Sequence, residues 1–160
     1  MNNLILLSHA AATLAMVGVV WFVQVVHYPL FTRVGRGEFR RYEIDHQRLT
    51  TFVVGPLMLI ELATGLLLAF RLGGGPLQIA AWGGLALLAA IWTMTYLLQI
   101  PQHAALIIDY NPATIRNLVR GNWARTIAWT ARGLVVLWIV SQVIVMPEAD
   151  LGSKLAFNPL

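Results

Sequence analysis

Three of the four histidines in this 160-residue chain stand beside long apolar segments, where a shared site could form. His27 ends the first segment, His46 begins the second, and His103 follows the third. His9 lies about 27 Å from His27 along a helix, so we expect it outside the group. Imidazole is the commonest metal ligand and titrates near neutral pH. The three histidines therefore predict a site that ligates a transition metal or heme, or supplies acid–base groups. The alternative is that they are ordinary residues of the membrane boundary.

The fourth apolar segment carries a polar stripe that starts at Asn122, a residue able to cap a helix. The members of the stripe follow at steps of three, four and three and share one helical face: Asn122, Arg125, Trp129 and Arg132. An arginine that faces lipid costs at least a few kcal/mol. We therefore expect Arg125 and Arg132 to hold an anionic group beside the flat ring of Trp129. Alternatively, Arg125 reaches the interface and Arg132 pairs with a carboxylate.

Glu61 lies near the middle of the second segment, where a carboxylate must pair, protonate or bind a ligand. Arg132 lies at a similar depth and is the expected partner, and Glu61 is also a candidate catalytic group. On the third segment, Tyr96 and Gln99 are candidate substrate-binding residues. We expect them to face the interior of the bundle, because lipid offers polar side chains no partner.

A shorter pattern joins Glu43 to His46. This E-x-x-H spacing puts both ligands of a di-iron carboxylate bundle on one helical face. Such proteins use two copies of the motif, and the chain has one. Glu43 and Asp45 also fit the ordinary role of acids in the first turn of a helix.

Composition indicates the class of protein that must position these residues. Hydrophobic residues make up 58% and charged residues 11%, whereas a soluble domain has about 25% charged residues. The mean hydropathy is +0.70 and the pI is about 10.1. Because the basic residues lie in the linkers, the pI indicates contact with lipid headgroups and not with nucleic acid. The absence of cysteine from the sequence excludes disulfides and thiol chemistry.

The sequence predicts one all-α domain over 1–160, an integral membrane four-helix bundle. Its spans cover about 4–27, 49–70, 77–100 and 123–146. A polar loop from about Pro29 to Arg48 follows the first span, and a glycine turn at 73–75 follows the second. We expect Pro101 to end the third span. Asn111 and Pro112 then begin a short surface helix over about 112–119, which ends near Gly121.

The arginines predict the orientation of the bundle. The two long linkers contain eight of them: Arg33, Arg36, Arg40, Arg41, Arg48, Arg116, Arg120 and Arg125. The opposite side has only Arg71 and Lys154. By the positive-inside rule, both linkers are cytoplasmic and both termini are outside, in the periplasm, for a multi-pass protein of the bacterial inner membrane.

Four stretches carry a resemblance to known proteins: VVHYPLF, YEIDHQRLTTFVVGPLMLIELATG, LQIPQHAAL and NWARTIAWTARG. They resemble small, mostly uncharacterised four-helix membrane proteins of bacteria, which are similar to the anthrone-oxygenase-like family. The resemblance implies four membrane helices and oxidation of a small aromatic molecule. The positions that match are His27, His46, Glu61, His103, Asn122, Arg125, Trp129 and Arg132. A histidine near the start of the first span also resembles the small heme-binding protoporphyrinogen oxidase of bacterial membranes, whose characteristic lysine has no counterpart here.

Together these features predict a membrane-embedded redox enzyme, or a metal- or heme-binding protein. It would act on a small aromatic or anionic molecule from a polar cavity at the cytoplasmic side. The alternative is a non-enzymatic small transporter or an accessory membrane subunit. The expected partners are the lipid bilayer and a small molecule, without nucleic acid, and self-association into a homo-oligomer is compatible with the sequence.

Overall fold

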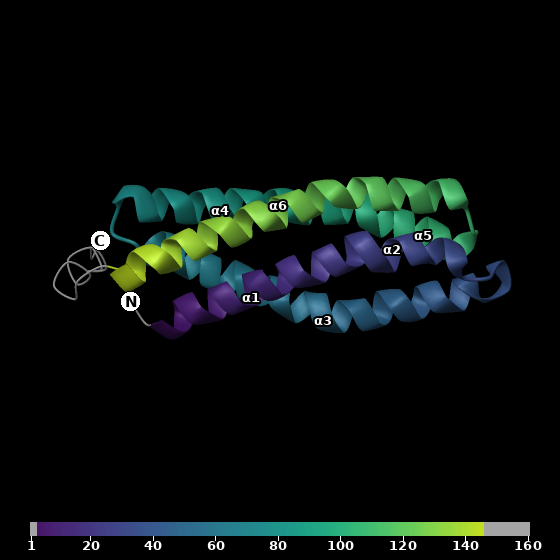
Figure 1. Cartoon of the computed structure of the whole chain (residues 1–160), viewed down its shortest axis with the longest axis horizontal. Coiled ribbons are helices and arrows are strands. Elements are labelled where there is room, and N and C mark those ends of the chain that lie inside the picture. The colour runs from purple at the N-terminus through teal and green to yellow at the C-terminus, as the bar shows by residue number, and fades with distance from the viewer. Residues whose placement is uncertain (1–2, 146–160) are drawn as a thin grey trace.

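The computed structural model describes residues 3–145, which form four long helical rods packed side by side (Figure 1). No strand occurs between residues 3 and 145. The first rod contains α1 (Asn3–Phe22), the π-helix η1 (Val23–His27), α2 (Tyr28–Leu30) and the 3-10 helix η2 (Phe31–Arg33). The second is α3 (Arg36–Arg71), and the fourth is α6 (Pro112–Val145). The third contains α4 (Gly75–Met94), the π-helix η3 (Thr95–Gln99) and α5 (Ile100–Ile108).

Each rod is long and apolar enough to cross a membrane. The predicted all-helical bundle with four spans is confirmed at this level. Apolar side chains such as Phe52, Phe70, Ile79 and Ile108 are exposed along its surface, as expected where lipid replaces water. The turn between α3 and α4 requires glycine, because Gly74 and Gly75 have φ values of 102° and 74°.

The helices extend well beyond the apolar segments at the linker end of the bundle. The predicted polar loop from Pro29 to Arg48 is wrong, because α3 already begins at Arg36. The reason is a buried cluster of aromatic and aliphatic side chains that the four rods build there: Tyr28, Phe31, Phe39, Leu106, Ile115 and Leu118. Burial of these side chains stabilises helical turns whose exposed faces are highly charged.

The predicted short helix over 112–119 is also wrong as a separate element. Asn111 does cap the helix start, since its Oδ1 accepts a hydrogen bond from the Ala113 N–H at 2.8 Å. The helix then runs through Gly121 without a break. A glycine inside a helix costs only about 1 kcal/mol, and Gly121 gives the side chain of Gln99 room to approach. Asn122 is therefore an interior residue of α6 and not a cap.

Two rods widen just before a proline near the linker end. The π-helices η1 and η3 end two residues before Pro29 and Pro101, respectively. Proline lacks an N–H, and its ring clashes with the carbonyl four residues earlier in a regular α-helix. The wider turn relieves this conflict, so Pro101 does not end the third span as predicted, and the helix continues to Ile108.

The rods pack around three buried layers, and the chain returns to the end where it started. The first rod contacts α3 and α6, and α4 contacts the same two helices. The middle layer contains Met16, Met58, Ile91 and Trp129. Asn3 and Val145 lie at the same end of the bundle, opposite the linker end, where the structure has only the short connections 34–35 and 109–111 (Figure 1).

Candidate functional site

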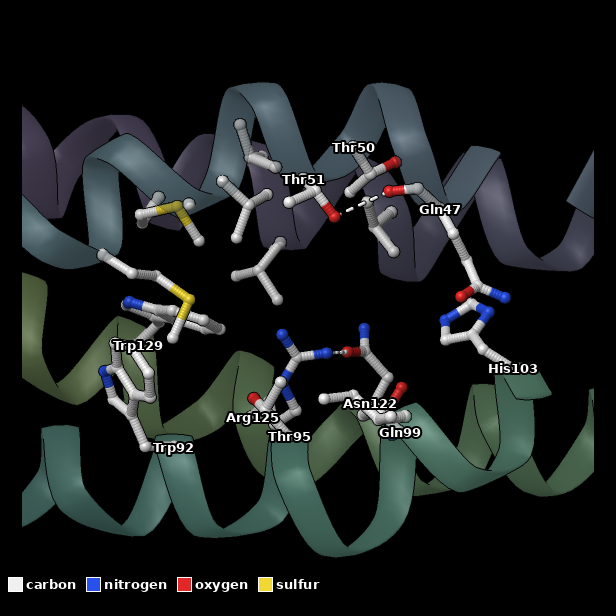
Figure 2. Close-up of a pocket in the computed structure, with 18 of the residues that line it drawn as sticks. Gln47, Thr50, Thr51, Trp92, Thr95, Gln99, His103, Asn122, Arg125 and Trp129 are labelled. Carbon is white, nitrogen blue, oxygen red and sulfur yellow. Dashed lines mark hydrogen bonds between the residues drawn. The ribbon is translucent and has the colours of Figure 1, made fainter. Parts of the chain in front are cut away.

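A cavity of about 440 Å³ opens beside the middle layer and reaches toward the linker end of the bundle. Its volume is in the range of small-molecule sites. Valine, methionine and tryptophan side chains form much of its wall, and each rod also contributes polar groups: Tyr28, His46, Gln99, His103, Asn122 and Arg125. Figure 2 shows Arg125 and Asn122 between α3 and the third rod, with Trp92 and Trp129 toward one end and His103 toward the other.

His103 is the centre of a hydrogen-bonded relay at one end of this cavity. Its Nδ1 lies 2.5 Å from Oε1 of Glu43, and its Nε2 lies 2.9 Å from the hydroxyl of Tyr28. An ionised Glu43 can only accept, so Nδ1 donates and Nε2 is free to accept the Tyr28 proton. Gln47 donates a further hydrogen bond to Glu43 Oε1 at 3.1 Å. This order of acid, imidazole and hydroxyl is the arrangement by which a base activates a hydroxyl group.

The other two linker-end histidines form a pair beside the relay. His27 Nε2 lies 2.8 Å from His46 Nδ1, and the His46 ring centre lies 5.3 Å from that of His103. The structure therefore brings together the three histidines that the sequence predicts for one site. His46 and His103 line the cavity, while His27 lies behind His46 and is half-buried.

The three imidazoles do not direct three free nitrogens at one point. Both ring nitrogens of His103 are engaged, and His27 and His46 bond to each other. Among residues 3–145, no group of three His, Asp or Glu side chains is arranged to hold a metal ion. The donor set therefore does not fit the three-histidine metal site that the sequence predicts, whereas its hydrogen bonds suit acid–base chemistry.

Arg125 is a buried cation at the middle of the cavity. Its Nη1 donates to Asn122 Oδ1 at 2.9 Å, and its guanidinium carbon lies 5.2 Å from the centre of the Trp129 ring. The guanidinium also interacts with the hydroxyl of Tyr28. Asn122 is held in turn by Gln24, whose Oε1 accepts from Asn122 Nδ2 at 2.9 Å. The predicted stripe from Asn122 to Trp129 thus faces the interior.

Nothing in the described part of the chain neutralises this cation. The ion pairs between residues 3 and 145 involve Asp45, Glu43 and Glu61, and none of them reaches Arg125. Its Nε is buried and has no hydrogen-bond partner within the same residues. The side chain of Gln99 is likewise buried with neither its oxygen nor its nitrogen bonded. Buried polar groups are normally paired, so these atoms indicate a place for a polar ligand.

Glu61 and Arg132 form the ion pair that the sequence predicts. Arg132 Nη2 lies 3.2 Å from Glu61 Oε1, and both side chains are fully buried. Arg132 also donates to the Gly84 carbonyl, and the Trp129 Nε1 donates to Glu61 Oε2 at 3.2 Å. Neither charged residue lines the cavity, so the structure separates them from Arg125, with the Trp129 ring between the two groups.

The two predicted substrate-binding residues of the third rod, Gln99 and Tyr96, differ in how far they face the interior. Gln99 is buried in the cavity wall, but Tyr96 is 72% exposed and lies at the edge of the cavity. The π-helical turn explains the difference, because it changes which side chains face the interior. His9 lies outside the histidine group, as predicted, with its Nδ1 2.8 Å from Thr64 Oγ1.

Sequence reasoning missed Glu43 and Tyr28 as members of the site. Glu43 is fully buried and is not an acid of a first helical turn. The E-x-x-H spacing did carry the relevant signal, since residues three apart share a helical face. For Tyr28, which directly follows His27, no spacing pattern indicated that its hydroxyl turns to the third rod.

Comparison of the chain with protein-family models, with curated proteins and with solved structures gives no match.

Proposed function

We propose that the protein is a membrane-embedded enzyme that binds a small, flat, acidic molecule in the cavity and removes a proton from it. The observation that carries the proposal is the uncompensated guanidinium of Arg125 in the cavity wall. A buried charge without a partner is costly, and an anionic ligand would provide the partner. The rings of Trp92 and Trp129 offer flat apolar surfaces for an aromatic body.

The hydrogen-bonded relay of Glu43, His103 and Tyr28 would supply the acid–base groups of this reaction. The Tyr28 hydroxyl would take the substrate proton as its own proton passes to His103 Nε2, and Glu43 would stabilise the imidazolium that forms. The negative charge left on the substrate oxygen would be held by Arg125, with Gln99 as a further hydrogen-bond donor. In this reaction the substrate C–H or O–H bond breaks, the substrate proton stays on Tyr28, the former Tyr28 proton ends on His103, and the electron pair stays on the substrate.

Oxidation is the continuation that the family resemblance favours. A deprotonated aromatic molecule is electron-rich, and its oxidation needs an acceptor, for which dioxygen is the proposed class. A location in the bacterial inner membrane, with the histidine end of the bundle toward the cytoplasm, belongs to the same proposal and follows from the distribution of arginines. The alternative function, a transporter or accessory subunit, would use the cavity for binding alone.

Arg125 and His103 allow binding and proton transfer to be tested separately. Hydrogen bonds to charged groups contribute about 1.5–3 kcal/mol, so Arg125→Met should weaken the binding of pyrenebutyrate, a fluorescent aromatic carboxylate, by about 10- to 100-fold. The matched control is Arg120→Met, an exposed arginine on the same helix that does not line the cavity. Equal affinity in both variants would contradict the anion site.

Proton removal is measured as deuterium incorporation from heavy water into anthrone, a compound suggested by the family resemblance. A positioned general base contributes typically about 100- to 10,000-fold, so His103→Gln should reduce the exchange rate by at least about 100-fold while pyrenebutyrate still binds. His9→Gln, outside the cavity, should leave the rate unchanged. Binding without protein-dependent exchange would favour the transporter or accessory role.

A further inference from the structure

We infer that the ligand enters the cavity sideways from the lipid bilayer, through an opening between α3 and the third rod. This inference rests on the proposed function and adds the class of substrate: a lipid-soluble amphiphile with one acidic oxygen group and a flat apolar body.

The exposed residues of the cavity wall locate the opening. A side chain that both lines a cavity and is exposed stands at its mouth. Five residues meet this description: Thr51, Leu59, Trp92, Tyr96 and Ile100. The first two belong to α3 and the other three to the third rod. The residues that the first rod and α6 contribute to the wall are buried or half-buried, so among residues 3–145 the exposed part of the wall lies between α3 and the third rod.

Helix packing explains why the opening forms there. The helix α3 packs against α4 toward one end and against α5 toward the other, whereas the π-helix η3 between them packs against α6. The mouth therefore lies level with the widened turn of the third rod. In Figure 2, Thr51 on α3 and Thr95 on the third rod lie on opposite sides of the space that contains Arg125.

The mouth residues lie at a depth where lipid would surround the bundle. The 36 residues of α3 extend about 54 Å at the rise of an α-helix, while the hydrocarbon core of a bilayer is about 30 Å thick. Thr51 and Leu59 lie on either side of the middle of α3. Their exposed neighbours on both flanks are apolar, such as Phe52, Leu97 and Leu98. Since none of the five mouth residues is charged, an apolar molecule can pass between them.

The chemistry along the path then selects the ligand. A molecule that enters from lipid meets apolar side chains first and the Arg125 guanidinium last. A carboxylate or phenolate group would reach the cation, and the apolar body would fill the space lined by the valines of the first rod, by Val54 of α3 and by the two tryptophans. A ligand of this kind dissolves in the bilayer, so its concentration beside the mouth exceeds that in water.

The experiment measures how fast pyrenebutyrate binds to the protein in phosphatidylcholine vesicles, by stopped-flow energy transfer from tryptophan. Tyr96→Ala should widen the mouth and raise the association and dissociation rate constants together, with little change in Kd. The control is Leu97→Ala, an exposed residue of the same turn that does not line the cavity. Gly55→Phe should narrow the path and slow association by at least about tenfold. Its control is Gly83→Phe on the outer surface of α4, where an added side chain meets open space.

The outcomes separate this inference from the proposed function. If Arg125→Met abolishes binding while Tyr96→Ala and Gly55→Phe bind at the wild-type rate, the ligand enters elsewhere and only the side opening is overturned. If wild-type protein does not bind pyrenebutyrate, or binds it independently of Arg125, the anion site itself is overturned. Should Gly55→Phe not fold, the pair Tyr96→Ala and Leu97→Ala still decides the question.

Discussion

The ion pair between Glu61 and Arg132 joins two helices in the middle of the bundle. Removing one partner of a buried pair typically costs about 3–5 kcal/mol, because it leaves an uncompensated charge, whereas replacing both can be nearly neutral. We expect Glu61→Gln and Arg132→Met each to lower the free energy of unfolding in detergent by about this amount, and the double variant to lose less than the sum. Arg71→Met, at the exposed end of α3, is the control. Strictly additive losses would show that the two residues do not stabilise each other.

Among single residues, the sequence predicted the three histidines that lie at one depth of the bundle. It did not predict the site residues whose position depends on packing between rods. His27, His46 and His103 could be grouped because each stands at the same end of its apolar segment. Glu43 could not, because the charged residues around it hide its burial, which depends on its contact with His103 of the third rod. Whether nitrogens point at a metal or at each other is decided by rotamers, which sequence spacing does not encode.

At the scale of elements, η3 contains one residue more than a regular helix would need over the same length. Deleting Leu98 together with Pro101→Ala should therefore convert the π-turn into an α-turn and leave the flanking helices in register, so the protein should still fold. Deleting Ala86 from the regular helix α4 should rotate the rest of the rod by about 100° and disrupt packing. Thermal unfolding followed by circular dichroism checks both. Similar melting temperatures for the two deletions would contradict the role assigned to the π-turn.

The existence of the four helices was predictable from sequence, whereas their ends were not. Apolar runs mark the parts of a helix that lipid surrounds, and these were found. Pro101 and Gly121 indicate only that a helix could end there. In the structure both helices continue past these residues, where they pack against neighbouring rods. The length of α3 and α6 beyond the apolar segments follows from long-range contacts around Phe39, Ile115 and Leu118.

At the scale of the molecule, the bundle has two ends of opposite character. Exposed arginines such as Arg36, Arg40 and Arg116 gather at the linker end, and Arg71 lies at the other. We expect both chain termini on the outer side of the membrane. A fusion after Leu160 should therefore yield active alkaline phosphatase, which folds only outside the cytoplasm, and an inactive cytoplasmic reporter. The reverse pattern of reporter activity would show that the bundle has the opposite orientation, with the His103 relay at the outer face of the membrane.

The pairing of Glu61 with Arg132 also constrains how the protein is made. The helix α6 has a mean hydropathy of 1.4 in its best segment, against 2.1 for α3, and each helix has a charge near its middle that lipid disfavours. Since α3 is synthesised before α6, Glu61 has no ion-pair partner until α6 has been translated. We therefore expect membrane insertion to be cooperative, with α6 stabilising the earlier helix α3 once the two charges can pair.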